Sequence, residues 1–164
     1  TKAYTTRVGE GPFPTELREG PVGAHLQQQG REIGATTGRP RRCGWFDAPV
    51  VRQAARLNGL TGLAVMKLDV LDGIDPLKIA VSYRDEAGAS YDALPHWTGT
   101  YGELTPVYEE LPGWDTPIRG ITEYERLPEK TRAYLNRISE LTGVPIDIVS
   151  TGPRREETIV IREG

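Results

Sequence analysis

The chain has few residues that could bind a metal or form a disulfide. Of its 164 residues, one is cysteine and two are histidine. A lone Cys43 cannot form an internal disulfide, so the sequence predicts a fold stabilised by packing in a reducing compartment, the cytoplasm. His25 and His96 are too isolated to indicate a metal site, and we expect His96 to be exposed. No metal ligand and no Ser/His/Asp triad is predicted.

The chain also lacks long apolar runs and a strong excess of charge. No run approaches the ~20 residues of a membrane span, so we expect no membrane association, and no targeting segment is visible. The net charge of −3 argues against a general affinity for nucleic acid. A Gly-x-x-x-x-Gly-Lys phosphate loop is missing, and the turn Gly9–Gly11 lacks the third glycine of a dinucleotide fingerprint.

Glycine and proline are abundant, at 19 and 13 residues. They are scattered along the chain, which is typical of ordered turns. The first residue is threonine, and the chain opens in a strand-like stretch with nothing before it. This opening indicates a piece of a longer protein.

The apolar pattern predicts an alternation of strands and helices. Strands are predicted at 2–8, 63–66, 77–83, 106–110, 145–149 and 158–161. Helices are predicted at 22–29, at 129–142, and from an N-cap at Asp47 to Asn58. The stretches 34–44 and 85–101 are predicted as loops. This alternation indicates an α/β fold, with a partial, mostly parallel sheet and flanking helices.

A basic loop follows the first predicted helix. Two threonine hydroxyls, a glycine and three arginines lie close together between Ala35 and Arg42. Arginine forks bind carboxylate and phosphate groups bidentately, and hydroxyls add hydrogen bonds, so the loop is suited to a small polyanion. The alternatives are a solvated basic turn and a contact to nucleic acid, and the acidic balance of the chain counts against the latter.

Two further loops follow predicted strands. Lys67-x-Asp69 is similar to the end of the guanine-specificity motif of GTPases, and Ser150-Thr151-Gly152-Pro153 follows the strand at 145–149. One carboxylate can accept both N1–H and the N2 amino group of guanine. Adenine would leave that carboxylate unpaired, which costs about 1–3 kcal/mol or more. In α/β sheets ligands bind beyond the carboxyl ends of strands, where the Ser-Thr-Gly turn is expected to expose backbone N–H groups. Taken alone, Lys67-x-Asp69 is better explained as an ordinary strand-end pair, and the Ser-Thr-Gly turn could be an ordinary strand-to-loop turn. Two such loops after two strands favour a guanine site more than either loop does alone.

Several longer motifs resemble one family. The run Gln29–Trp45 resembles the adenylosuccinate synthetase signature around its aspartate-binding loop. The segments Val8–Leu17, Lys67–Asp72 and Glu140–Pro153 also resemble that family, in the same order along the chain. The resemblance extends from end to end and is least specific between Asp85 and Tyr101. It implies that residues 1–164 form a single C-terminal portion of a P-loop-related ligase, which joins L-aspartate to IMP with GTP hydrolysis in AMP biosynthesis.

The family's roles map onto the three loops. The basic loop is expected to close over aspartate, with Thr37, Arg39 and Arg41 as direct ligands and Arg42 pointing away. Arg39 also matches a residue near IMP, and Arg41 one that reaches the GTP phosphates. A backbone contact to the IMP ribose is expected at Val8. The implied substrate-binding residues are Ala35, Thr36, Thr37, Gly38, Arg39, Pro40 and Arg41. The implied GTP-binding residues are Arg41, Lys67, Leu68, Asp69, Ser150, Thr151 and Gly152.

The chain departs from the family in what it does not contain. The family's phosphate loop, its essential aspartate and histidine, its Mg²⁺ site and most IMP contacts lie toward the N-terminus. We therefore assign no catalytic residue here and expect this portion to be inactive alone, within a homodimeric full-length enzyme. The alternative is a free-standing guanine-nucleotide-binding module without catalysis.

Overall fold

The computed structural model describes residues 1–36, 38–93 and 98–161. Thr37 and His96, both considered above, lie outside the described residues. The chain divides into two compact units. Unit 1 comprises Thr1–Ala3, Val51–Leu77 and Glu110–Gly164, and unit 2 comprises Tyr4–Val50 and Lys78–Glu109. Residues 1–164, which the sequence predicted as a single portion, thus contain two compact units.

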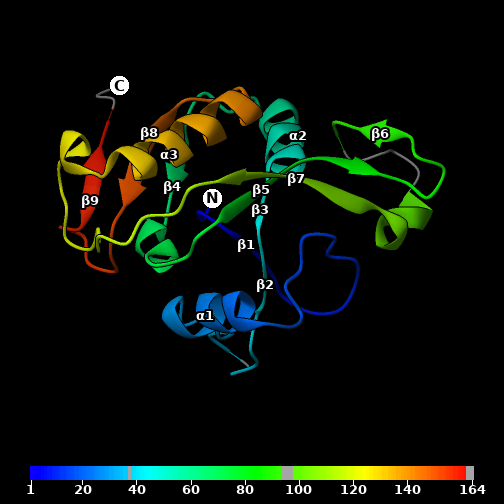
Figure 1. The fold of residues 1–164 in the computed structure, drawn as a ribbon, viewed down its shortest axis with the longest axis horizontal. Helices are drawn as coiled ribbons and strands as arrows, with labels where there is room; N and C mark the ends of the chain where they lie inside the picture. Colours follow the sequence, from blue (N-terminus) through cyan, green and yellow to red (C-terminus); the bar gives the residue numbers. More distant parts are fainter. Residues whose placement is uncertain (37, 94–97, 162–164) are drawn as a thin grey trace. The chain divides into compact units, whose positions relative to one another are not determined.

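Unit 1 is built on a sheet of three strands, which lie side by side in Figure 1. They are β4 (Leu63–Val65), β8 (Ile146–Ser150) and β9 (Thr158–Val160). Strands β4 and β8 are parallel, whereas β9 runs antiparallel to β8. The first residues of the chain extend the sheet beyond β4, because Ala3 N–H donates to the Met66 carbonyl at 2.9 Å.

Helix α3 (Glu129–Thr142) lies beside this sheet (Figure 1). Pro128 precedes it, and Gly143 ends it in the left-handed conformation with φ 71°. Its apolar stripe, which includes Leu135 and Ile138, is buried, and the buried Tyr134 hydroxyl donates to the Ala3 carbonyl at 2.7 Å. The bounds of this helix are those predicted from the sequence. The rest of unit 1 includes residues 51–58 of α2 (Ala48–Asn58) and the 3-10 helices η1 (Leu68–Leu71) and η3 (Tyr124–Arg126).

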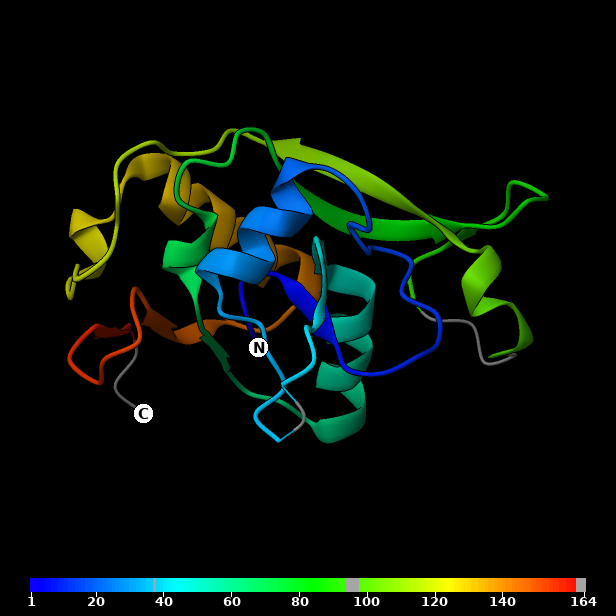
Figure 2. The ribbon, with the colours of Figure 1, turned by 90° about the horizontal axis from the view of Figure 1, so that it is seen from below.

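Unit 2 contains helix α1 (Pro21–Gln29), a two-stranded sheet and most of a second sheet. The two-stranded sheet pairs β1 (Thr5–Arg7) with β2 (Arg42–Gly44). In the second sheet β5 (Leu77–Arg84) contacts β3 (Phe46–Asp47), β6 (Ser90–Tyr91) and β7 (Thr105–Leu111), and the 3-10 helix η2 (Thr98–Glu103) precedes β7. Figure 2 shows β5 and β7 running next to each other.

A buried carboxylate joins β3 to the start of α2 in unit 2. Asp47 Oδ1 accepts the Val50 N–H at 3.2 Å, which confirms the predicted N-cap. The Tyr83 hydroxyl, on β5, donates to the other oxygen of Asp47. Burial raises the pKa of both Asp47 and Tyr83, and the Asp47 charge raises that of Tyr83 further. Asp47 therefore links β3, α2 and β5 through hydrogen bonds of its buried carboxylate.

The mixed α/β class is confirmed, and the expectation of a mostly parallel sheet is not. The parallel pairs β3–β5 and β4–β8 are accompanied by antiparallel pairs at β1–β2, β5–β6 and β8–β9. The strand predicted at 2–8 is shorter, Thr5–Arg7, and the loop predicted at 34–44 ends early because Arg42–Gly44 pairs with that strand. The predicted excursion at 85–101 contains β6. Within the described residues, no helix has the length and apolar character to cross a membrane.

Candidate functional site

Two of the candidate loops meet at one edge of the sheet in unit 1. Strands β4 and β8 are parallel neighbours, so their carboxyl ends lie at the same edge. Lys67 follows β4, and Ser150 ends β8. The Lys67 N–H donates to Ser150 Oγ at 2.9 Å. The structure therefore brings together the two loops that the sequence only placed after separate strands.

The backbone at Lys67 turns sharply out of the strand. Lys67 adopts the left-handed conformation, with φ 60° and ψ 36°, and η1 begins at the next residue. Leu68, side chain and backbone together, is fully buried. Asp69 lies in the first turn of η1 and is half-buried. This geometry presents the Asp69 carboxylate beside the edge where β4 and β8 end.

Several charges surround Asp69. Burial raises the pKa of its carboxyl, and this rise is opposed by a hydrogen bond from its own backbone N–H and then by the positive charges of Arg119 and Lys67. The negative charge of Glu157 acts in the opposite direction. Asp69 is thus a partly desolvated carboxylate with cations close enough to stabilise its charged form.

The turn after β8 is packed more tightly than its sequence indicated. Thr151 is buried, its hydroxyl donates to the Ile121 carbonyl at 2.8 Å, and its N–H donates to the Glu157 carbonyl at 2.9 Å. The expectation that this turn exposes free backbone N–H groups is therefore wrong for Thr151. A Cβ at Gly152 would press on the Glu157 carboxylate, so a larger residue there would have to displace that side chain. The Ser150 hydroxyl accepts from Lys67 and keeps its own hydrogen to donate.

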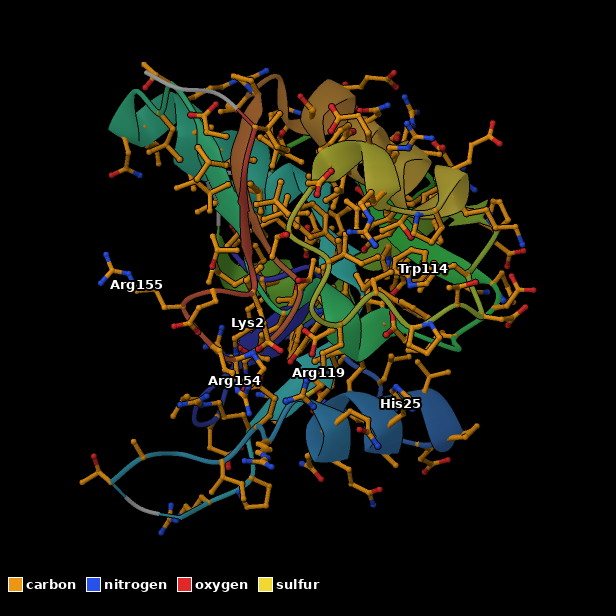
Figure 3. The ribbon with its side chains drawn as sticks, turned by 90° about the vertical axis from the view of Figure 1, so that its left-hand side faces the viewer. Lys2, His25, Trp114, Arg119, Arg154 and Arg155 are labelled. Carbon is orange, nitrogen blue, oxygen red and sulfur yellow. The ribbon has the colours of Figure 1, made fainter. Side chains whose placement is uncertain are left out.

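Sequence reasoning missed Arg119 and Glu157 in this site. Glu157 Oε2 accepts the Arg154 N–H at 2.8 Å, and its Oε1 lies 3.6 Å from Arg119 Nε. Figure 3 shows Arg119 and Arg154 on the same side of unit 1. Neither Arg119 nor Glu157 belongs to a recognisable motif, and only the folded chain brings them near Asp69.

The third candidate loop lies in unit 2 and forms a closed turn. Gly34 N–H donates to the Arg39 carbonyl at 2.8 Å, and Gly38 N–H donates to the Gly34 carbonyl at 2.9 Å. Ile33 and Pro40 form an isolated antiparallel bridge at its base. Thr37 lies outside the described residues. The residues of the turn that are exposed are Ala35, Thr36, Gly38, Arg39 and Pro40.

Arg41 lies at the base of this turn and is anchored from inside. The Glu32 carboxylate is fully buried and accepts the Tyr4 hydroxyl at 2.5 Å and Arg41 Nη1 at 2.9 Å. The side chain of Arg41 is 27% exposed. Because a guanidinium carries five N–H donors, Arg41 can be held by Glu32 and still donate to a ligand.

Arg42 is engaged with different residues. Its guanidinium forms a fork with both oxygens of Glu16, at 2.7 Å each, and donates to the carbonyls of Gly9 and Gly11. Arg42, and then Arg18, lower the pKa of Glu16 to about 2. Arg42 therefore braces the loop 9–16, which follows the exposed Val8. Removal of Arg42 would therefore disturb the loop 9–16.

A polar hollow of about 300 Å³ adjoins the base of the turn. Arg41 and Arg42 line it together with Glu16, Arg18 and Gln27. The Gln27 amide donates to the Arg41 carbonyl at 3.2 Å, which fixes the backbone on one side. Across the described ranges, no group of three or more His, Cys, Asp or Glu side chains could hold a metal ion.

Comparison with known proteins gives one consistent result. Residues 1–159 match the family described as adenylosuccinate synthetase. The adenylosuccinate synthetase of Halorhodospira halophila is 57% identical over 161 residues, which are 98% of this chain and 37% of that relative. That of Bordetella avium is 55% identical over 162 residues, which are 99% of this chain and 37% of the relative.

A solved structure, described as the fully ligated adenylosuccinate synthetase from Plasmodium falciparum, matches with a TM-score of 0.93 and 36% sequence identity. The match covers 98% of this chain and 38% of that chain. The chain thus spans little more than a third of the length of the proteins that it matches.

Proposed function

The chain belongs to the adenylosuccinate synthetase family, and we propose that it supplies the guanine pocket and the aspartate loop of a ligase that joins L-aspartate to IMP with GTP hydrolysis. The observation that carries the proposal is the meeting of Lys67 and Ser150 at the ends of two parallel strands, with Asp69 beside them. Strand ends of this kind are where α/β sheets bind ligands.

Asp69 is the residue that would select guanine. Its two carboxylate oxygens match the adjacent N1–H and N2 amino donors of the base. Lys67, directly before η1, places a positive charge near this carboxylate. The Ser150 hydroxyl would donate to a base oxygen, next to the buried Leu68 and Thr151. An adenine base would leave the carboxylate without its two donors, which is the basis of discrimination.

The turn 35–41 would bind the second substrate. L-Aspartate carries two carboxylates. Arg39 on the exposed turn and the partly buried Arg41 at its base supply two guanidinium groups. Thr37, between Gly34 and Gly38 in the sequence, would add a hydroxyl. Glycine at position 38 has φ 65°, and position 34 is also glycine, so the turn has the backbone freedom to close over a ligand. Closure would exclude water and strengthen these charge-assisted hydrogen bonds. Arg39 would also lie near IMP, Arg41 near the GTP phosphates, and the Val8 backbone at the IMP ribose.

The remaining chemistry belongs to the part of the relatives that this chain does not span. That part would hold the phosphate loop of a P-loop-related fold, the acid and base, and the Mg²⁺ site. The described residues contain no cluster of carboxylates and histidines suited to a metal, so we assign no step through Mg²⁺ to them. We propose that residues 1–164 are inactive alone and work as one portion of a cytoplasmic, homodimeric enzyme.

Asp69→Asn tests the guanine pocket in the ligase that carries this chain. An amide accepts one guanine donor but cannot accept both, so the KM for GTP should rise roughly tenfold or more, as expected for a lost charge-assisted hydrogen bond of about 1.5–3 kcal/mol. The KM for ITP, which lacks the N2 amino group, should change much less. Steady-state rates with GTP, ITP and ATP measure both effects. An unchanged preference for GTP over ITP would remove Asp69 from the pocket, and guanine-nucleotide binding without turnover would favour a non-catalytic module.

A further inference from the structure

A turn formed by residues 118–121 connects the two loops of the candidate guanine site in unit 1. The turn is closed by the Ile121 N–H, which donates to the Ile118 carbonyl at 3.1 Å. On one side the Ile118 N–H donates to the Asp72 carboxylate at 3.1 Å. On the other side the Ile121 carbonyl accepts the Thr151 hydroxyl at 2.8 Å. The turn is therefore tied both to the residue that follows η1 and to the turn after β8.

Asp72 holds this connection with both of its carboxylate oxygens. Oδ2 accepts the Ile118 N–H, and Oδ1 accepts the Trp114 Nε1–H at 2.6 Å. The Trp114 carbonyl in turn accepts the Gly73 N–H at 3.0 Å. Trp114 is buried and packs edge-on against Tyr134, with ring centroids 6.0 Å apart. The chain that leads into the turn is thus fixed to the end of η1 by hydrogen bonds and by packing.

Asp69 lies in a segment that is tied at both ends to the turn after β8. At its start the Lys67 N–H donates directly to Ser150 Oγ at 2.9 Å. At its end Asp72, whose own N–H donates to the Asp69 carbonyl at 3.2 Å, is connected to that turn through residues 118–121. Lys67 adopts the left-handed conformation, which a residue other than glycine keeps where its surroundings fix it. The two ties therefore hold the backbone of Asp69 in place relative to the edge where β4 and β8 end.

We propose that Asp72 is a positioning residue for guanine selection, which acts through the turn 118–121 to keep the Asp69 carboxylate in register with both donors of the base. The inference rests on the proposed function, in which Asp69 accepts N1–H and the N2 amino group together. Two hydrogen bonds to adjacent donors need both carboxylate oxygens at a suitable distance and angle, whereas a single bond tolerates a small shift. Loosening the tie at Asp72 should therefore weaken the binding of GTP more than that of ITP, which lacks the N2 amino group.

Asp72→Asn loosens the tie with little change of shape. The amide keeps one oxygen as an acceptor, but its NH2 group meets the second N–H donor, so one of the bonds to Trp114 and Ile118 is lost. Steady-state rates of the ligase that carries this chain are measured with GTP and with ITP, at saturating IMP and aspartate. The KM for GTP should rise about three- to tenfold and that for ITP less than about twofold, with little change in kcat.

Thr151→Val tests the other end of the same tie. Valine has the shape of threonine without the hydroxyl, which lies 2.8 Å from the Ile121 carbonyl and 3.3 Å from the Glu157 carbonyl. The backbone hydrogen bond from the Thr151 N–H to the Glu157 carbonyl does not depend on that hydroxyl. Because both variants break one connection, the double variant with Asp72→Asn should raise the KM for GTP by little more than the larger single effect. Independent effects would multiply.

Thr142→Val is the matched control for the loss of a buried hydroxyl. Thr142 is a buried residue of the same unit, and its hydroxyl donates to the Ile138 carbonyl within α3 at 2.7 Å. Its substitution should lower the Tm of the ligase and leave the ratio of the KM values for ITP and GTP at the wild-type value. The Tm of each variant therefore separates a loss of stability from a loss of positioning.

A KM that rises for GTP much more than for ITP, together with effects of the two variants that do not multiply, would support the proposal. Equal rises for both nucleotides, or single effects that multiply in the double variant, would overturn it. If Asp72→Asn does not fold, Thr151→Val decides: a ratio of KM values equal to that of Thr142→Val would overturn the proposal. Asp69→Asn is measured in parallel, and a wild-type preference for GTP in that variant would instead overturn the proposed guanine pocket, and the inference with it.

Discussion

Arg41 is the residue at which stability and substrate binding can be separated. Its Nη1 donates to the fully buried Glu32 carboxylate at 2.9 Å, and the Tyr4 hydroxyl also donates to that group. Arg41→Leu would remove the Arg41 guanidinium from this buried carboxylate and keep the Tyr4 hydrogen bond. Breaking a buried ion pair by removing one partner costs about 3–5 kcal/mol. Because Arg41 is 27% exposed and water can enter in its place, we expect a loss of about 2–3 kcal/mol.

Arg41→Lys distinguishes the two roles. Lysine keeps a positive charge for Glu32, so the free energy of unfolding should fall by only about 1 kcal/mol. It loses the planar fork that binds a carboxylate bidentately, so aspartate binding should suffer in both variants. One lost charge-assisted hydrogen bond of about 1.5–3 kcal/mol corresponds to a roughly tenfold or larger rise in the KM for aspartate.

Two measurements check these expectations. Urea unfolding of the 164-residue chain gives the change in stability, and initial rates with varied aspartate give the KM in the ligase that carries the chain. Arg31→Leu is the control, since Arg31 is an exposed arginine close to the same turn. Arg42 is unsuitable as a control because it holds Glu16 and the carbonyls of Gly9 and Gly11.

The reasoning fails if Arg41→Leu and Arg31→Leu raise the KM for aspartate by the same small factor, because the turn would then be a solvated basic loop. An unfolding midpoint for Arg41→Leu equal to that of the wild type would separately contradict the role given to the Glu32 pair.

Two further predictions concern the Glu16 brace and the chain as a whole. Glu16 has a pKa lowered to about 2, so its pairing with Arg42 stabilises the fold fully above the ordinary glutamate pKa of about 4.3, and that contribution is lost as the pH falls toward 2. Urea unfolding between pH 6 and 2 should show this loss, about 1–2 kcal/mol once solvent screening of the pair is allowed for. Glu16→Gln should reduce the pH dependence by that amount, and an identical slope in the variant would refute the reasoning. The isolated 164-residue chain should form no adenylosuccinate from IMP, GTP, Mg²⁺ and aspartate in an absorbance assay, and turnover above background by the pure chain would contradict our placement of the missing chemistry.

Local signals in the sequence determine some features of this protein. Helix α3 begins and ends where Pro128 and Gly143 predict, because helix ends and an apolar stripe depend on residues that are neighbours in sequence. The Asp47 N-cap is predictable for the same reason. The motifs around Arg41, Lys67 and Ser150 are also contiguous, so they are recognisable from the order of residues alone.

The orientation of the strands is not predictable in this way. Alternating helices and strands favour a mostly parallel sheet, yet β9 returns antiparallel to β8 after a short turn, and β2 pairs with β1 across a long stretch of chain. Hydrophobic periodicity reports which residues are buried in a strand, but it does not report which strand lies beside it. Strand pairing is decided by contacts between distant segments.

The same distinction separates the parts of the candidate site. The sequence alone determined which residue types could recognise guanine and a dicarboxylate, since that chemistry is carried by single side chains and short loops. Only the tertiary structure decided that Lys67 meets Ser150, that Arg41 is held by Glu32, and that Arg119 pairs with Glu157. Electrostatic and hydrogen-bonding interactions act across a few ångströms of space, and separation along the chain does not determine which groups come that close until the chain has folded.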